Sequence, residues 1–80
     1  MDMPHSKDVL DQQFLEMRWR TLSLAADLDR ISRGDNGPRT LKDDARLQKL
    51  RRALEVLMSD GVDRAERVQM IFSDMTPPPR

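Results

Sequence analysis

The sequence predicts an all-α protein, built as a long antiparallel helical hairpin with a short third helix and arranged as a three-helix bundle. Apolar residues recur every three or four positions along three segments, as they do in amphipathic helices. No segment shows the two-residue alternation of a half-buried β-strand. Glycine and proline occur only between or outside the three segments, so they separate the predicted helices.

The first and longest helix is expected over residues 7–33. Ser6 can cap its free amide groups, and Gly34 suits the left-handed conformation that often closes a helix. At 1.5 Å per residue this helix would be about 40 Å long. Asp29 and Arg33 are spaced for an ion pair on its surface.

Two shorter helices are expected over residues 42–59 and 63–74, with Gly61 between them. Asp63 and Glu66 have the spacing of a capping box at the start of the third helix. A short connection makes the first two helices antiparallel neighbours. The third helix could pack on this hairpin or along the rest of the first helix, and both arrangements stay open. Each shorter helix has one apolar face, formed by Leu47, Leu50, Ala53, Leu54 and Leu57 in the second and by Ala65, Val68, Ile71, Phe72 and Met75 in the third.

The first helix differs from the others because it carries apolar residues on two sides. One set, here named the Phe14 face, follows alternating steps of four and three residues, as in a coiled coil. A second set, the Trp19 face, repeats this stepping roughly 150° away around the helix. A single neighbouring helix cannot cover both. The Phe14 face consists of Leu10, Phe14, Met17, Thr21, Leu24, Leu28 and Ile31, and the Trp19 face of Leu15, Trp19, Leu22 and Ala26.

This excess of apolar surface indicates a protein-interaction module. No small-molecule ligand is evident from the sequence. The third helix could cover the Trp19 face in a closed monomer, a second copy of the chain could bind there, or a different protein could do so. Helical hairpins with surplus apolar surface commonly form dimers with twofold symmetry. We therefore expect a homodimer or a complex with an unidentified protein partner. The predicted interface residues are Leu15, Trp19, Leu22, Ala26, Ile71 and Phe72.

The chain lacks the residues on which most enzymes depend. It has no cysteine and no tyrosine, and its one histidine, His5, precedes the first helix, where we expect a solvated tail residue. Glycine-rich phosphate loops, nucleophile elbows and paired metal ligands are missing from the sequence. We therefore expect no enzymatic activity, no cofactor and no metal site.

The charges balance, with 14 Lys and Arg against 14 Asp and Glu. Binding of a polyanion depends on a local excess of cations, so the composition does not favour nucleic acid as a partner. The alternative that we retain is a weak nucleic-acid-binding helical protein that uses Lys49, Arg51 and Arg52 on the second helix. Against it, the two arginines diverge by about 100° around the helix, and Glu55 shares their side.

The ends of the chain are expected to lie outside a single helical domain over residues 7–75. Residues 1–6 should form a flexible tail without the apolar core of a secretion signal. Residues 76–80 should form a proline-rich tail, which either docks a partner domain or stays extended. No apolar run approaches the roughly 20 residues that cross a membrane. Together with the lack of cysteine, these features predict a soluble cytoplasmic protein.

The helical segments resemble those of short bacterial helical proteins that are described only as hypothetical. The residues that carry this resemblance are FLEMRWRTLSLAADLDRI (Phe14–Ile31), DARLQKLRRALEVL (Asp44–Leu57) and DRAERVQMIFSD (Asp63–Asp74), which together span most of the chain. The resemblance implies a bacterial cytoplasmic setting, and it brings no activity or site residue with it.

Overall fold

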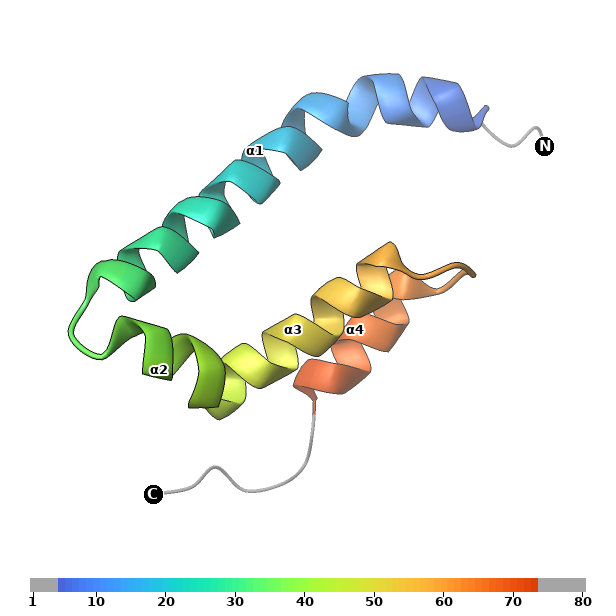
Figure 1. The fold of residues 1–80 in the computed structure, drawn as a ribbon. Helices are drawn as coiled ribbons and strands as arrows, with labels where there is room; N and C mark the ends of the chain where they lie inside the picture. The colour runs from blue at the N-terminus through green and yellow to red at the C-terminus, as the bar shows by residue number, and fades with distance from the viewer. Residues whose placement is uncertain (1–4, 74–80) are drawn as a thin grey trace. The chain divides into compact units, whose positions relative to one another are not determined.

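The computed structural model of the chain describes residues 5–73, and all regular secondary structure in that range is α-helical (Figure 1). The predicted all-α class is therefore confirmed. The chain divides into two compact units, one ending at Gly37 and the other beginning at Pro38. The helices are α1 (Ser6–Arg33), α2 (Gly37–Asp43), α3 (Ala45–Met58) and α4 (Arg64–Phe72).

The start of α1 is capped by His5 and not by the expected Ser6. Ser6 is the first residue of the helix, while His5 holds the N-cap position in an extended conformation. The Nδ1 atom of His5 accepts a hydrogen bond from the backbone N–H of Lys7 at 3.2 Å. An imidazole nitrogen can do this because the N–H groups of a first turn have no acceptor within the helix. His5 is exposed, as expected for a solvated residue, but it caps α1 and does not belong to a tail.

The end of α1 also differs from the expectation, although Gly34 does follow the last helical residue. Gly34 has an extended backbone with φ −73° and ψ 170°, and its N–H donates to the carbonyl oxygen of Ile31 at 3.1 Å. The left-handed conformation lies two residues later, at Asn36 with φ 57°. Asparagine tolerates this region better than most residues that carry a side chain.

The glycine that the turn requires is Gly37, the first residue of α2. Gly37 is buried, and its N–H donates to the carbonyl oxygen of Gly34 at 3.0 Å. A Cβ atom at this position would collide with the backbone carbonyl groups of Ile31 and Ser32. Pro38 follows in the first turn of α2. Its missing N–H group breaks no hydrogen bond there, because the N–H groups of a first turn have no acceptor within the helix.

The helix expected over residues 42–59 corresponds to α3, and the shorter α2 before it was not predicted. α2 ends at Asp43, and Asp44 interrupts the helical backbone with φ −66° and ψ 130° before α3 begins. The Asp44 side chain caps α3, because its Oδ1 accepts a hydrogen bond from the backbone N–H of Arg46 at 2.8 Å. The predicted helix therefore begins three residues later than expected, at Ala45.

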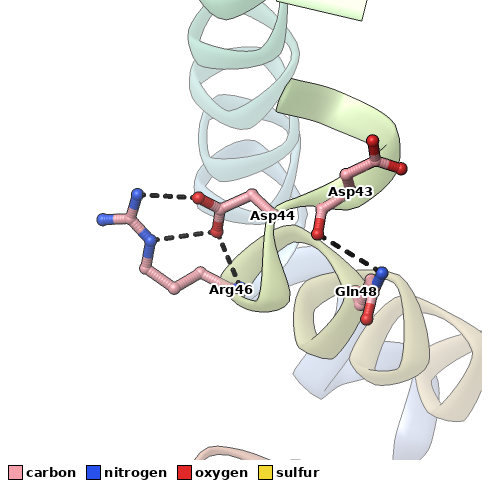
Figure 2. A network of polar contacts seen from close by, with 4 residues as sticks. All are labelled: Asp43, Asp44, Arg46 and Gln48. Atoms are coloured by element: carbon pink, nitrogen blue, oxygen red, sulfur yellow. Dashed lines mark hydrogen bonds and ion pairs between the residues drawn. The ribbon is translucent and has the colours of Figure 1, made fainter. Parts of the chain in front are cut away.

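Figure 2 shows the polar contacts at this junction between α2 and α3. The Arg46 guanidinium forms a bidentate contact with the Asp44 carboxylate. Its Nε donates to Oδ1 and its Nη2 to Oδ2, both at 3.0 Å. The Gln48 amide donates to the carbonyl oxygen of Asp43 at 3.5 Å, which links α3 back to the last turn of α2. Hydrogen bonds from the side chain and then the backbone of Arg46 lower the pKa of Asp44 from 3.8 to about 2.

α4 packs against α3 within the second unit (Figure 1). Ala53 of α3 is 3% exposed and is the one buried apolar residue within residues 5–73. Around it, Leu50 and Leu54 of α3 and Val68 and Ile71 of α4 are half-buried. This helix pair therefore has a small core that uses part of the predicted apolar faces. Leu57, Ala65 and Phe72 of those faces are exposed, and Met75 lies outside the described residues.

Ser59, at the end of α3, is the polar link to α4. Arg64 donates to its carbonyl oxygen at 2.6 Å, and Arg67 donates to its hydroxyl at 3.0 Å. The Ser59 hydroxyl in turn donates to the carbonyl oxygen of Val56 at 2.6 Å. The connection between the helices is thus held from both sides.

The loop before α4 contains two residues in the left-handed region, Gly61 with φ 105° and Asp63 with φ 63°. Asp63 occupies the N-cap position of α4, but its side chain makes no capping hydrogen bond. A side-chain cap needs the extended backbone that N-cap residues usually adopt. The capping box predicted between Asp63 and Glu66 therefore does not form.

The remaining predicted boundaries concern the two ends of the chain. α4 ends at Phe72, two residues before the expected end. Residues 1–4 of the predicted first tail and all of the predicted tail 76–80 lie outside the described residues. The single domain over residues 7–75 stays a prediction.

Gly37→Ala is expected to lower the free energy of unfolding by about 1–3 kcal/mol, the usual cost of forcing atoms into a packed site. Gly34→Ala is the matched control, since its Cβ would lie at an ordinary 3.4 Å from the carbonyl oxygen of Ile31. Urea unfolding followed by circular dichroism measures both. Equal losses in the two variants would contradict the close contact at Gly37.

The Asp44 cap predicts a loss of stability at acid pH. Because the pKa of Asp44 is lower in the folded chain than its ordinary value of 3.8, the ionised carboxylate stabilises the fold above that value. This contribution is lost as the pH falls from about 4 toward 2. In Arg46→Ala, an NMR titration should show a higher pKa for Asp44, still below 3.8 because the backbone N–H of residue 46 remains a donor. An unchanged pKa would show that Arg46 is not the cause.

Candidate protein-interaction surface on α1

The Trp19 face of α1 is open along its whole length. Leu15, Trp19, Leu22 and Ala26 are all exposed, with 62% of Leu15 and 61% of Trp19 accessible to solvent. A tryptophan removes 150–250 Å² of surface from water when it packs. Isolated apolar side chains are normal on a protein surface, but a contiguous group marks a binding surface. The structure thus brings these four predicted interface residues together on one side of α1.

The side chains of the Phe14 face are exposed to different degrees along α1. Toward the end of the helix, Leu24, Leu28 and Ile31 are half-buried. In the first half of the helix, Phe14 and Met17 are exposed. Apolar surface is therefore accessible on two sides of the same helical segment, as the sequence predicted.

A shallow hollow lies on α1 between the two faces, lined by Phe14, Met17, Arg18, Thr21 and Leu22. The first four of these residues have the spacing i, i+3, i+4 and i+7, which forms the hole that a side chain of a facing helix fills in coiled-coil packing. Sequence reasoning assigned Arg18 to neither face, although this spacing could have shown that it borders such a hole.

The hydroxyl of Thr21 is satisfied within α1 itself, so it needs no partner from a facing helix. Its Oγ1 donates to the carbonyl oxygen of Met17 at 2.8 Å. A threonine bonded in this way presents its methyl group to a neighbour. Thr21 is therefore compatible with an apolar face.

The ion pairs that α1 forms lie outside both apolar faces. Arg20 donates to the Glu16 carboxylate at 2.7 Å, and Arg30 pairs with Asp27. All four side chains are exposed, so each pair contributes little stability. These pairs leave the Trp19 face free of competing charge contacts.

The ion pair expected between Asp29 and Arg33 does not form within residues 5–73. Both residues are exposed, and neither side chain has a charged partner in this part of the chain. Arg33 is the last residue of α1, where a cation interacts favourably with the helix dipole without any partner. The spacing was thus correct for a pair, but it was not sufficient.

The two interface residues predicted on the last helix, Ile71 and Phe72, lie at the end of α4. Ile71 is half-buried, whereas Phe72 is 50% exposed. Because α4 packs on α3, Ile71 contributes part of its surface to that helix pair. A role in binding stays a prediction for both residues.

The alternative cationic site lies on α3. Arg51 and Arg52 are exposed, and Lys49 is half-buried. Consecutive helical residues point about 100° apart, so the two arginines do not face one phosphate group together. Glu55, one turn beyond Arg51, is also exposed and places a negative charge in the same area. Binding of nucleic acid here stays a prediction.

Comparison of the chain with protein-family models, with curated proteins and with solved structures finds no match in any of the three. In the part of the chain that the structure describes, no helix combines the length and apolar character needed to cross a membrane. The same residues contain no group of three or more side chains placed to hold a metal ion.

Proposed function

We propose that this chain is a small non-enzymatic helical module that acts through protein–protein contacts and self-associates through α1. The observation that carries the proposal is the exposure of large apolar side chains on two sides of one helix, with Trp19 61% accessible. A helix of this kind needs a neighbour on each side. Exposed apolar surface of this extent on a small domain is typical of a binding surface.

The small core supports self-association as the kind of binding. Ala53 is the one buried apolar residue within residues 5–73, and the chain has no cysteine for a disulfide. Domains of this size commonly depend on disulfides, metals, regular packing or oligomerisation for their stability. A second copy of the chain would add buried apolar area without requiring any other partner.

The proposed interface consists of the Trp19 face, with Ile71 and Phe72 as further candidates on α4. Tryptophan residues are enriched among the few residues that carry most of the binding energy of an interface. Leu15 and Leu22 flank Trp19 at helical spacing and would exclude water around the indole. We place the module in the bacterial cytoplasm, because of the resemblance of its helical segments and its lack of cysteine.

Trp19→Ala is expected to weaken the dimer by about 2 kcal/mol or more, which is about 30-fold or more in the dissociation constant. Sedimentation velocity over a concentration series measures the change. Val9→Ala is the control, because Val9 is also exposed on α1 but belongs to neither apolar face. It should leave the dissociation constant close to that of the unchanged protein.

Two results would contradict the proposal. The unchanged chain could sediment as a monomer at every concentration, in which case a different protein is the partner to seek. Alternatively, circular dichroism could show that Trp19→Ala unfolds the chain while Val9→Ala does not. The indole would then belong to the core of one chain and not to an interface.

A further inference from the structure

The Trp19 face continues toward both ends of α1 as polar residues with the same alternating steps of four and three. These residues complete a line along most of the helix, which we name the extended Trp19 face. Every residue of this line is exposed. It consists of Asp8, Gln12, Leu15, Trp19, Leu22, Ala26, Asp29 and Arg33.

The charged residues of this line have no charged partner within residues 5–73. Asp8, Asp29 and Arg33 take part in no side-chain ion pair there, whereas the pairs that α1 does form lie outside the line. The line therefore presents four apolar side chains in its middle and unsatisfied charges at its ends. Asp8, near the start of the helix, is negatively charged, and Arg33, at its end, is positively charged.

Resting on the proposed self-association, we propose that the occupant of this face is α1 of a second copy, which lies antiparallel to the first about a twofold axis. The axis passes between Trp19 and Leu22, at the height of the Arg20–Thr21 peptide along α1. In this register each residue of the line faces another member of the line. Trp19 faces Leu22 of the second copy, and Leu15 faces Ala26. Toward the ends, Gln12 faces Asp29 and Asp8 faces Arg33. The symmetry repeats each of these contacts once.

The facing residues are complementary in size and in charge. The large Leu15 lies opposite the small Ala26, and the indole of Trp19 lies against an aliphatic leucine, as interdigitating helices require. A carboxylate of Asp8 opposite the guanidinium of Arg33 allows a charge-assisted hydrogen bond at each end of the pair. The amide of Gln12 can donate to the carboxylate of Asp29.

The flanks of the line agree with the same register. Arg18 would lie beside Ala25 of the second copy, and Glu16 would lie beside Ser23. No two like charges meet on either flank, and the long stem of Arg18 can pack over the small Ala25 side chain. Opposing charges at these flanking positions usually decide how two helices pair.

Other arrangements of the same two helices place poor partners opposite each other. A parallel pair in register would set Asp8, Asp29 and Arg33 each against its own copy, and like charges across an interface are repulsive. Shifting one helix of the antiparallel pair along the other by seven residues would place Trp19 opposite Asp29 of the second copy. A shift of seven residues in the other direction would place Asp8 opposite Ala26. The charge pattern therefore selects both the direction and the register.

Charge reversal tests the pairing of Asp8 with Arg33. Asp8→Arg and Arg33→Asp should each weaken the dimer by about tenfold, because each sets like charges opposite each other twice. The double variant should return to within about threefold of the unchanged protein, because the charges are again opposite. An effect through the helix dipole predicts the reverse order, with the double variant the weakest, since both substitutions oppose the dipole.

The matched control reverses two exposed charges on α3, away from the proposed interface. Arg51→Glu combined with Glu55→Arg preserves the net charge and should leave the dissociation constant unchanged. Sedimentation velocity measures all variants, and circular dichroism establishes that each is helical. Equal weakening in this control would show a general charge effect and would overturn the proposed pairing.

The direction of the two helices is tested independently with Ser32→Cys. The chain has no cysteine, so a spin label at this position is the only one on each copy. An antiparallel pair in the proposed register separates the two labels by about 35 Å along the helix axis. A parallel pair would hold them at about 10 Å, the distance between packed helix axes.

The outcomes separate this inference from the proposed function. A dimer with distant labels and a restored double variant supports both. A dimer with close labels, or a double variant weaker than either single one, overturns the antiparallel pairing and leaves self-association in place. A chain that stays monomeric at all concentrations overturns the two together.

Discussion

One constraint governs this small protein: its longest helix is apolar on two sides, and a single neighbour can cover only one of them. Leu15, Trp19 and Leu22 are exposed on one side, and Phe14 and Met17 on another. Burying a large apolar side chain is worth about 1.5–3 kcal/mol, so leaving several of them in water is a considerable loss for a domain of marginal stability. The protein gains most by placing this surface against another helix.

The second unit shows how little apolar packing the rest of the chain supplies. Its helix pair is built around Ala53, and polar contacts hold the helix ends in place. Arg46 fixes the Asp44 cap at one end of α3, and Arg64 and Arg67 bind Ser59 at the other. Most of these contacts are exposed to solvent, so they define the geometry of the helix junctions more than they stabilise the fold.

Much of this fold could be predicted from the sequence, because apolar periodicity and helix breakers are local signals. The details that could not be predicted depend on competition between neighbouring residues. The sequence did not predict α2 and placed the start of α3 too early, because several nearby polar residues could have served as the cap that Asp44 provides. Gly37 is needed for a close approach to α1, which leaves the left-handed position to Asn36. His5 was overlooked as a cap because imidazole seldom has that role.

The surface of α1 was predictable for a different reason: the side of a helix on which a residue lies follows from its number alone. The same regularity assigns charged residues to the line of apolar residues, and the spacing of Phe14, Met17, Arg18 and Thr21 also contains the hollow beside Arg18. In the proposed dimer the two kinds of residue have separate effects. Leu15, Trp19 and Leu22 supply affinity, which is largely indifferent to helix direction, since apolar contacts are not directional. Asp8 and Arg33 supply the direction, since complementary charges contribute specificity more than affinity. Salt screens exposed charges while leaving apolar contacts intact, so it should relax the choice between antiparallel and parallel pairing before it separates the two chains.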